Sequence, residues 1–234
     1  MSFPIDRSLS RLYAIRFGKG FQYGGDAFAF IYYLAWVNNI WVLIDVGFSE
    51  QKLAEKMGIH LFSVEEKIRK LIEPESISAI LLTHSHWDHI DDIEKYEKAK
   101  LYLSKNTFGK AISENCESTR KSLKKAREEG RVVFLNTLDV IFDIFKFELV
   151  GGHSEDSGVF YFEYGGKLYC IAGDECFSIN DIKRNIPIEN AFDKKKNLQF
   201  TEKCFEKCAV ILPSHDNTVM EEYPQISSNI VRVI

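Results

Sequence analysis

The sequence predicts a mixed α/β (α+β) chain in which two β-sheets pack face to face and helices cover their outer sides. Short apolar runs rich in β-branched and aromatic residues recur in two sequential halves of the chain, and polar segments with helical apolar spacing separate them. No internal repeat, low-complexity tract or Pro/Gly-rich linker divides the 234 residues. We therefore expect one domain over residues 1–234.

The first half of the chain opens with β-structure. A buried hairpin is expected from strands at 28–35 and 40–45, because two aromatic and β-branched runs flank Asn38-Asn39. The same Asn pair divides the apolar stretch at 27–48 into two runs. Each run is too short to cross roughly 30 Å of hydrocarbon as a helix, so no membrane segment is expected. Residues 18–26, GKGFQYGGD, contain four glycines and two aromatics and predict a mobile loop that serves as a substrate flap.

The remaining elements alternate between the two types. Apolar residues at helical spacing predict a helix at 63–73 with Ser63 as its cap, and Gly165-Gly166 predicts a hairpin turn. The other expected elements are strands at 12–16, 77–83, 100–103, 131–135, 145–150, 159–164, 167–172 and 209–213 and helices at 107–129 and 198–207.

Composition limits the partners. The net charge of -4 and the pI near 5.9 give no bulk attraction to a polyanion, and acidic residues balance the lysines at 121–127 and 194–196, so nucleic acid is disfavoured. The chain has five cysteines and no paired Cys-x-x-Cys motifs, which predicts free thiols in a reducing cytoplasm. The N-terminus has no apolar signal region, which agrees with that location. Cys204 and Cys208 lie four residues apart, and core filling is favoured there over a metal or redox role. The oligomeric state stays open, with a homodimer as one option.

The stretch THSHWDH begins where a buried strand is expected to end. It places His84, His86, Asp88 and His89 within six residues, in a chain with six histidines. In an extended segment His84 and His86 project to one side, and Asp88 and His89 follow after a turn. Such a loop can provide ligands to two neighbouring metal ions, whereas a solvated polar loop would hold these groups in conflicting protonation states without a partner.

Three more residues of ligand type occupy the same kind of position. His153 follows a β run in VGGHSEDSG, Asp174 follows one in YCIAGDE, and His215 follows one in VILPSHDN. Taken singly, each is better explained as a turn or loop residue. Together they indicate that several strand ends contribute to one site.

These motifs resemble those of the metallo-β-lactamase superfamily. Its His-x-His-x-Asp-His motif matches residues 84–89, and its other motifs match VLIDVG at 42–47, GGH at 151–153, GDE at 173–175 and PSHD at 213–216. The resemblance implies a four-layer αββα sandwich of two mixed sheets with a binuclear metal site along one edge. It implies that His84, His86 and His153 hold the first ion, that Asp88, His89 and His215 hold the second, and that Asp174 bridges both. Asp45 is then expected just behind the site, where it hydrogen-bonds to loop groups or ligands.

The expected pair of divalent ions indicates that the chain catalyses hydrolysis. Two ions sharing a water lower its pKa from near 15.7 to about 7 and polarise the group under attack, and Asp88 or Asp174 could pass the proton to the leaving group. The expected function is attack by a metal-bridging hydroxide on the carbonyl of a small ester, lactone or thioester. Zinc is the expected ion, with iron and manganese as alternatives that His and Asp also suit. A phosphodiesterase or nuclease of the same superfamily, or a binding protein that keeps the metal site, remains an alternative.

The substrate side is less constrained. The sequence is similar to the N-acyl homoserine lactone lactonase branch, but Phe177 stands where those enzymes carry a tyrosine that hydrogen-bonds the substrate carbonyl, and Asp91-Asp92 replaces small residues after the first motif. An acidic helix N-terminus is the favoured explanation of the two aspartates. Expected substrate contacts are Phe21 and Tyr23 in the glycine-rich loop, together with Phe177. Phe17 is a further candidate, and Trp87 is expected to pack and orient the metal loop.

Overall fold

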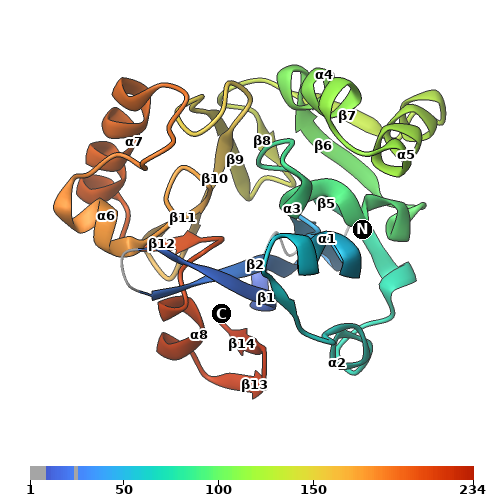
Figure 1. The fold of residues 1–234 in the computed structure, drawn as a ribbon, viewed down its shortest axis with the longest axis horizontal. Helices are drawn as coiled ribbons and strands as arrows, with labels where there is room; N and C mark the ends of the chain where they lie inside the picture. The colour runs from blue at the N-terminus through green and yellow to red at the C-terminus, as the bar shows by residue number, and fades with distance from the viewer. Residues whose placement is uncertain (1–8, 24–25) are drawn as a thin grey trace, which may run out of the picture.

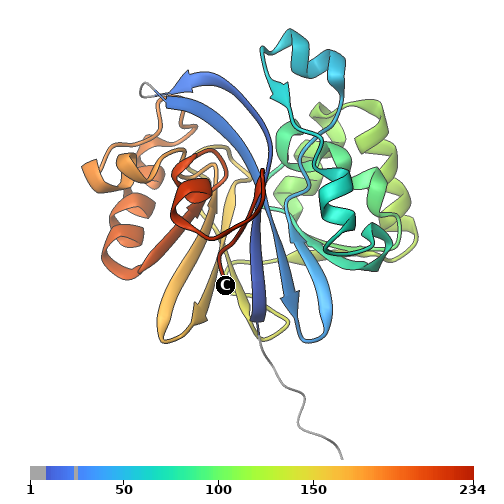
Figure 2. The ribbon, with the colours of Figure 1, turned by 90° about the horizontal axis from the view of Figure 1, so that it is seen from below.

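The structure, a computed structural model, describes residues 9–23 and 26–234, with the side chains of residues 21–23 and 26 outside the description. Two mixed β-sheets lie face to face in the middle of the molecule, and helices cover the outer side of each (Figure 1). Figure 2 shows the same layers from below, with the helices of the first half on one side and those of the second half on the other. The predicted αββα sandwich is confirmed.

The first sheet has the strand order β13-β14-β1-β2-β3-β5-β6-β7, with β4 paired to β1, in the described residues. Its strands from β13 to β3 run antiparallel and those from β3 to β7 parallel. The strands are β1 (Leu9–Tyr23), β2 (Asp26–Val37), β3 (Ile40–Ile44), β4 (His60–Leu61), β5 (Ile77–Leu81), β6 (Lys100–Ser104), β7 (Val132–Leu135), β13 (Gln225–Ser227) and β14 (Ile230–Arg232).

The second sheet has the order β12-β11-β10-β9-β8. The pair β11 and β12 is parallel, and the other pairs are antiparallel. Its strands are β8 (Val140–Ile141), β9 (Phe145–Leu149), β10 (Gly158–Tyr164), β11 (Lys167–Gly173) and β12 (Val210–Pro213).

Three buried apolar clusters fill the spaces between the layers. One lies between the sheets and includes Ile44 from the first sheet and Phe160 from the second, one lies under α1 to α5, and one lies under α6 and α7. The helices are α1 (Gln51–Lys56), α2 (Glu65–Arg69), α3 (Trp87–Ile90), α4 (Lys105–Glu114), α5 (Glu117–Glu128), α6 (Ile179–Arg184), α7 (Lys194–Lys207) and α8 (Thr218–Glu222), with 3-10 turns η1 (Pro74–Ser76) and η2 (Asp91–Tyr96). Among the described residues, no helix combines the length and apolar character that crossing a bilayer requires.

Both predicted tight turns are present. Asn38 and Asn39 have φ angles of 47° and 64°, and Gly165 and Gly166 have 56° and 72°, so each pair adopts the left-handed backbone of a two-residue hairpin turn. These turns fix the register of β2 with β3 and of β10 with β11.

The predicted loop over residues 18–26 is wrong for most of its length. Strand β1 continues to Tyr23 and pairs with β2 up to Asp26. The glycines here allow close packing: a Cβ on Gly20 would lie 2.9 Å from the carbonyl oxygen of Gly58 and 3.1 Å from Cα of Ile59. The glycine-rich pattern was misread as flexibility because glycine occurs both in flexible loops and where two backbone segments pack closely.

Helix boundaries also differ from prediction. The helix expected at 107–129 is two helices, α4 and α5, which break at Asn115 because its ψ of 172° is extended. The helix expected at 63–73 is only the five residues of α2, with Val64 and not Ser63 at its N-cap. Helix α7 begins four residues earlier than expected, where the Asp193 side chain accepts hydrogen bonds from the first-turn amides of Lys195 and Lys196.

Candidate metal centre

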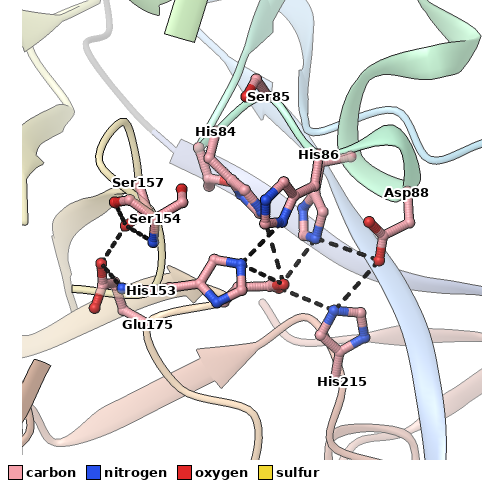
Figure 3. A network of polar contacts seen from close by, with 12 residues as sticks. His84, Ser85, His86, Asp88, His153, Ser154, Ser157, Glu175 and His215 are labelled. Carbon is pink, nitrogen blue, oxygen red and sulfur yellow. Dashed lines mark hydrogen bonds and ion pairs between the residues drawn. The ribbon is translucent and has the colours of Figure 1, made fainter. Parts of the chain in front are cut away.

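Five strands end close to the candidate site. Asp45 follows β3, His84 and His86 follow β5, His153 lies in the loop after β9, Asp174 follows β11, and His215 follows β12. The next turn, α3, carries Asp88 and His89. Figure 3 shows His84, His86, Asp88, His153 and His215 pointing toward one another from these separate loops. The structure therefore brings together all seven residues that the sequence nominated as ligands.

Asp174 lies at the centre of the cluster. One of its oxygens, Oδ2, is 3.7 Å from Nε2 of His84 and 3.3 Å from Nε2 of His153. The other, Oδ1, is 3.0 Å from Nε2 of His89 and 2.9 Å from Nε2 of His215. Each oxygen of this carboxylate thus faces a different pair of histidines.

His86 and Asp88 complete the two sides. Nδ1 of His86 is 2.9 Å from Nε2 of His153. Oδ2 of Asp88 is 3.7 Å from Nε2 of His89 and 3.6 Å from Nε2 of His215. The ligand atoms form two groups that share Asp174, and within each group all atoms lie within 4.8 Å of one another. The first group is His84, His86, His153 and Asp174. The second group is Asp88, His89, Asp174 and His215.

The donor atoms fit a pair of divalent metal ions. Nε2 of His84, Nε2 of His89 and Oδ1 of Asp174 are buried and make no hydrogen bond in the described part of the chain. Buried polar atoms without a hydrogen bond are costly, and here they converge from several directions on the same small volume. Imidazole nitrogen and carboxylate oxygen are suitable ligands for zinc, and also for iron and manganese. A cation on each side of Asp174 would satisfy these atoms.

Bonds behind the cluster fix the orientation of three imidazole rings. Nδ1 of His89 donates to Oδ2 of Asp45 at 2.8 Å, and Nδ1 of His215 donates to the carbonyl oxygen of Ala29 at 2.6 Å. Nδ1 of His84 is 3.1 Å from the Thr83 hydroxyl, which itself donates to Asp45 at 2.8 Å. With the proton held on Nδ1, the Nε2 lone pair of each ring faces the centre.

The charges in the cluster depend on one another. Burial lowers the pKa of His84 well below the usual value for histidine, and it lowers the pKa of His153 to about 4. Burial alone would also lower the pKa of His89, but the carboxylates of Asp174, Asp88 and Asp45 raise it well above its usual value. Burial would raise the pKa of Asp174, yet the surrounding histidines hold it well below its ordinary range, so this residue is an anion.

Two buried carboxylates that the sequence analysis did not single out hold the ligand loops. Oε1 of Glu175 accepts from the amides of Gly152 and His153 at 2.8 and 3.0 Å and from the Ser157 hydroxyl, and its Oε2 accepts from the Asn197 side chain at 2.8 Å. Figure 3 shows Glu175 beside the loop that carries His153. Burial raises the pKa of Glu175.

The second carboxylate is Asp156. Its Oδ2 accepts from the amide of Ser85, between His84 and His86, and its Oδ1 accepts from the Ser154 hydroxyl, both at 2.8 Å. It therefore ties the loop after β5 to the loop after β9. The sequence offered a weak signal for both residues, since each is an acidic neighbour of a metal-ligand motif.

Aromatic rings form one wall of the centre. Phe28 stacks on His215 with a centroid distance of 4.0 Å and an interplanar angle of 20°, and Phe30 meets the same ring edge-on at 5.2 Å. Phe177 lies 5.5 Å from the His153 ring and 5.6 Å from that of His215. The structure thus brings Phe177 to the site, together with two strand aromatics that the sequence analysis treated as ordinary core.

The other predicted aromatic contacts have different surroundings. Phe17 is buried against Phe30, Tyr32 and Phe48, in the core beneath the helices of the first half. Trp87 packs edge-on against Phe48 at 4.5 Å, which anchors the turn between the ligands of the loop. The side chains of Phe21 and Tyr23 lie outside the described residues.

Asp91 and Asp92 are engaged elsewhere. Both lie in the first turn of η2, where Asp91 accepts from the Thr119 hydroxyl at 2.6 Å and Asp92 accepts from the Ser49 hydroxyl at 2.9 Å. Asp92 also pairs with Lys95 at 3.0 Å. These contacts favour the predicted role at a helix N-terminus over a contribution to the metal centre.

The fold and the clustered His and Asp ligands are those of a family of metal-dependent proteins. The model of the metallo-β-lactamase superfamily matches residues 25–215, and the chain belongs to this superfamily. No curated protein matches it in sequence.

Solved structures agree on the fold. The chain is similar to a quorum-quenching N-acyl homoserine lactone lactonase, with 14% identity, a TM-score of 0.75, and 94% of this chain and 98% of that chain covered. A probable metal-dependent hydrolase from Staphylococcus aureus shares 15% identity at a TM-score of 0.73, with 90% and 91% covered. AidC, a dizinc quorum-quenching lactonase, shares 16% identity at a TM-score of 0.64, with 89% and 80% covered. At these identities the likeness shows the fold alone.

Proposed function

We propose that this chain is a binuclear metal-dependent hydrolase that attacks the carbonyl carbon of a small ester, lactone or thioester and breaks its acyl carbon–oxygen or carbon–sulfur bond. The observation that carries the proposal is the convergence of two ligand groups on the single carboxylate of Asp174. In the proposal, zinc is the ion on both sides. His84, His86 and His153 hold one ion, Asp88, His89 and His215 hold the other, and Asp174 lies between them.

The ions supply a water that is acidic near neutral pH and an electrophile for the carbonyl oxygen. The chain's own residues orient the ligands and transfer the proton. Asp45 and the carbonyl oxygen of Ala29 hold protons on Nδ1 of His89 and His215, which keeps both Nε2 atoms free to ligate. Asp88, whose side chain is 10% exposed, lies within 3.7 Å of both rings, and its carboxylate can carry a proton to a leaving group.

The surroundings of the centre support an uncharged acyl substrate. Phe28, Phe30 and Phe177 present apolar rings next to the histidines, and such a surface binds acyl groups better than phosphate. The chain's net charge of -4 also does not favour an anionic substrate. Two of the similar structures are lactonases by their descriptions, which agrees with a carbonyl substrate.

A substrate panel tests the proposal. Zinc-loaded protein is assayed against lactones, thioesters and bis-p-nitrophenyl phosphate, with His86→Ala as the variant that removes one ligand. We expect hydrolysis of at least one carbonyl substrate, and loss of both activity and metal content in His86→Ala. Phosphodiester hydrolysis without turnover of any carbonyl substrate would favour the phosphodiesterase alternative. Full turnover by the variant at wild-type metal content would refute the assigned centre.

A further inference from the structure

A second group of soft ligands lies away from the candidate metal centre. Cys170 of β11, Cys204 of α7 and Cys208, which caps the end of α7, bring their Sγ atoms within 4.8 Å of one another. They share no residue with the His/Asp groups. The sequence analysis paired Cys204 with Cys208 and assigned them to the core, but it gave no sign that Cys170 joins them.

The cluster is closed on one side and open on the other. Cys170 and Cys204 are fully buried, whereas Cys208 is half-buried, so an ion could enter past Cys208. Hydrogen bonds with Cys170 and Cys204, together with the charges of Lys203 and Lys207, lower the pKa of Cys208 below the usual value for a thiol. The accessible member of the cluster thus lies within electrostatic reach of two lysines.

A buried phenol next to the cluster also lacks a partner. Tyr161 lies directly opposite Cys170 on the neighbouring strand β10, so the two side chains share the face of the sheet that α7 covers. Its side chain is 7% exposed, and its hydroxyl makes no hydrogen bond in the described part of the chain. An unsatisfied donor in such a place is expensive, and negatively charged thiolates beside it would offer an acceptor.

A disulfide explains the cluster less well. Side chains four apart on a helix have Cβ atoms about 5–6 Å apart, whereas a disulfide needs about 3.5–4.5 Å. Cys204 and Cys208 are therefore poorly placed to bond to each other. A disulfide from Cys170 to either one would leave the third thiol unused, whereas a metal ion uses all three.

We propose that Cys170, Cys204 and Cys208 form a separate binding site for a thiophilic divalent ion such as zinc, which ties the end of α7 to strand β11. Zinc–thiolate bonds of about 2.3 Å in a tetrahedral arrangement place sulfur atoms roughly 3.8 Å apart, within the observed spacing. Binding displaces the protons of the thiols to solvent. The site does not depend on the proposed hydrolase activity.

Cobalt is a suitable probe because Co²⁺ bound by thiolates gives an intense sulfur-to-cobalt charge-transfer band in the near ultraviolet. Histidine and aspartate ligands do not give this band. Reduced wild-type protein, freed of metal with a chelator, is titrated with Co²⁺ alongside Cys204→Ser, Cys208→Ser and the control Cys116→Ser. Cys116 is an exposed cysteine outside the cluster. Circular dichroism verifies that each variant is folded, and His86→Ala separates this site from the His/Asp centre.

We expect the band in wild type, in Cys116→Ser and in His86→Ala, its loss in Cys208→Ser, and its disappearance when Zn²⁺ is added. If Cys204→Ser does not fold, Cys208→Ser decides the result, because its side chain is only half-buried at the helix end. The proposal is overturned if wild type shows no band or if Cys208→Ser keeps it. It is also overturned if the protein, after treatment with a reductant, still has a mass two hydrogens below that of five free thiols.

Discussion

Replacing Asp45 by asparagine tests how the chain orients a metal ligand. Asp45 is 2% exposed, and its carboxylate accepts from the Thr83 amide at 2.9 Å, the Thr83 hydroxyl at 2.8 Å and Nδ1 of His89 at 2.8 Å. An asparagine fills the same space, and with its oxygen in the Oδ1 position it still accepts from the Thr83 amide. The oxygen that is replaced, Oδ2, accepts from both the Thr83 hydroxyl and His89. The amide NH₂ group then faces His89, and it can only donate.

The expected effect is on metal binding. Facing a donor, His89 must accept on Nδ1, which moves its proton to Nε2 and blocks the lone pair that points at Asp174. Losing a carboxylate partner of a ligating histidine typically weakens metal affinity by about 10–100-fold. That range corresponds to roughly 1.4–2.8 kcal/mol. The weakening should fall on the side of the centre formed by Asp88, His89 and His215.

Calorimetric titration of the metal-free protein with Zn²⁺ measures this change, and thermal unfolding verifies the fold. Asp143→Asn is a matched control, because Asp143 has nearly the same left-handed backbone, with φ of 59° against 61° for Asp45, but is exposed. We expect wild-type affinity in the control and one weakened zinc site in Asp45→Asn. Two sites of unchanged affinity in a folded Asp45→Asn protein would refute the argument that Asp45 sets the tautomer of His89.

Three further predictions concern the wall of the centre, the packing and the ions. Phe177→Tyr adds a hydroxyl to a ring beside His153 and His215. It should raise lactone kcat by up to about 100-fold, the low end of the range for one oxyanion donor; unchanged kcat on every lactone tested would contradict this. Gly158→Ala should destabilise by about 1–3 kcal/mol, because its Cβ would lie 2.5 Å from the Phe147 ring. Gly109→Ala, with open space around it in α4, should stabilise by about 0.5–1 kcal/mol, and denaturant unfolding of both variants distinguishes the two cases. Zinc at about 100-fold over its Kd should stabilise the native state by about 2.7 kcal/mol per site. Removing it with a chelator should therefore lower Tm by roughly 5–10 °C per site. A Tm unaffected by chelator would show that no ion stabilises the native state.

The ligands could be read from the sequence because each follows a recognisable strand. His84, His153, Asp174 and His215 come directly after or shortly beyond apolar β runs, and the strands of two packed sheets bring such ends to a common edge. The Asn38-Asn39 turn and the buried strand before His84 could be recognised from local chemistry alone.

The support around the ligands could not be predicted in the same way. Glu175 accepts from residues more than twenty positions away, and its place next to Asp174 is the only local sign of this role. Phe28 and Phe30 read as core residues because only the three-dimensional path of β2 brings them against His215. The glycines of β1 were misread for a related reason, since their neighbours Gly58 and Ile59 come from a distant turn.

Anomalous scattering from crystals of the zinc-loaded protein tests the central claim most directly. The proposed centre predicts two peaks about 3.5–4 Å apart, one on each side of the Asp174 carboxylate, the first among His84, His86 and His153 and the second among Asp88, His89 and His215. A zinc-loaded crystal with a single peak there, or with none while these side chains hydrogen-bond to one another, would contradict the binuclear centre.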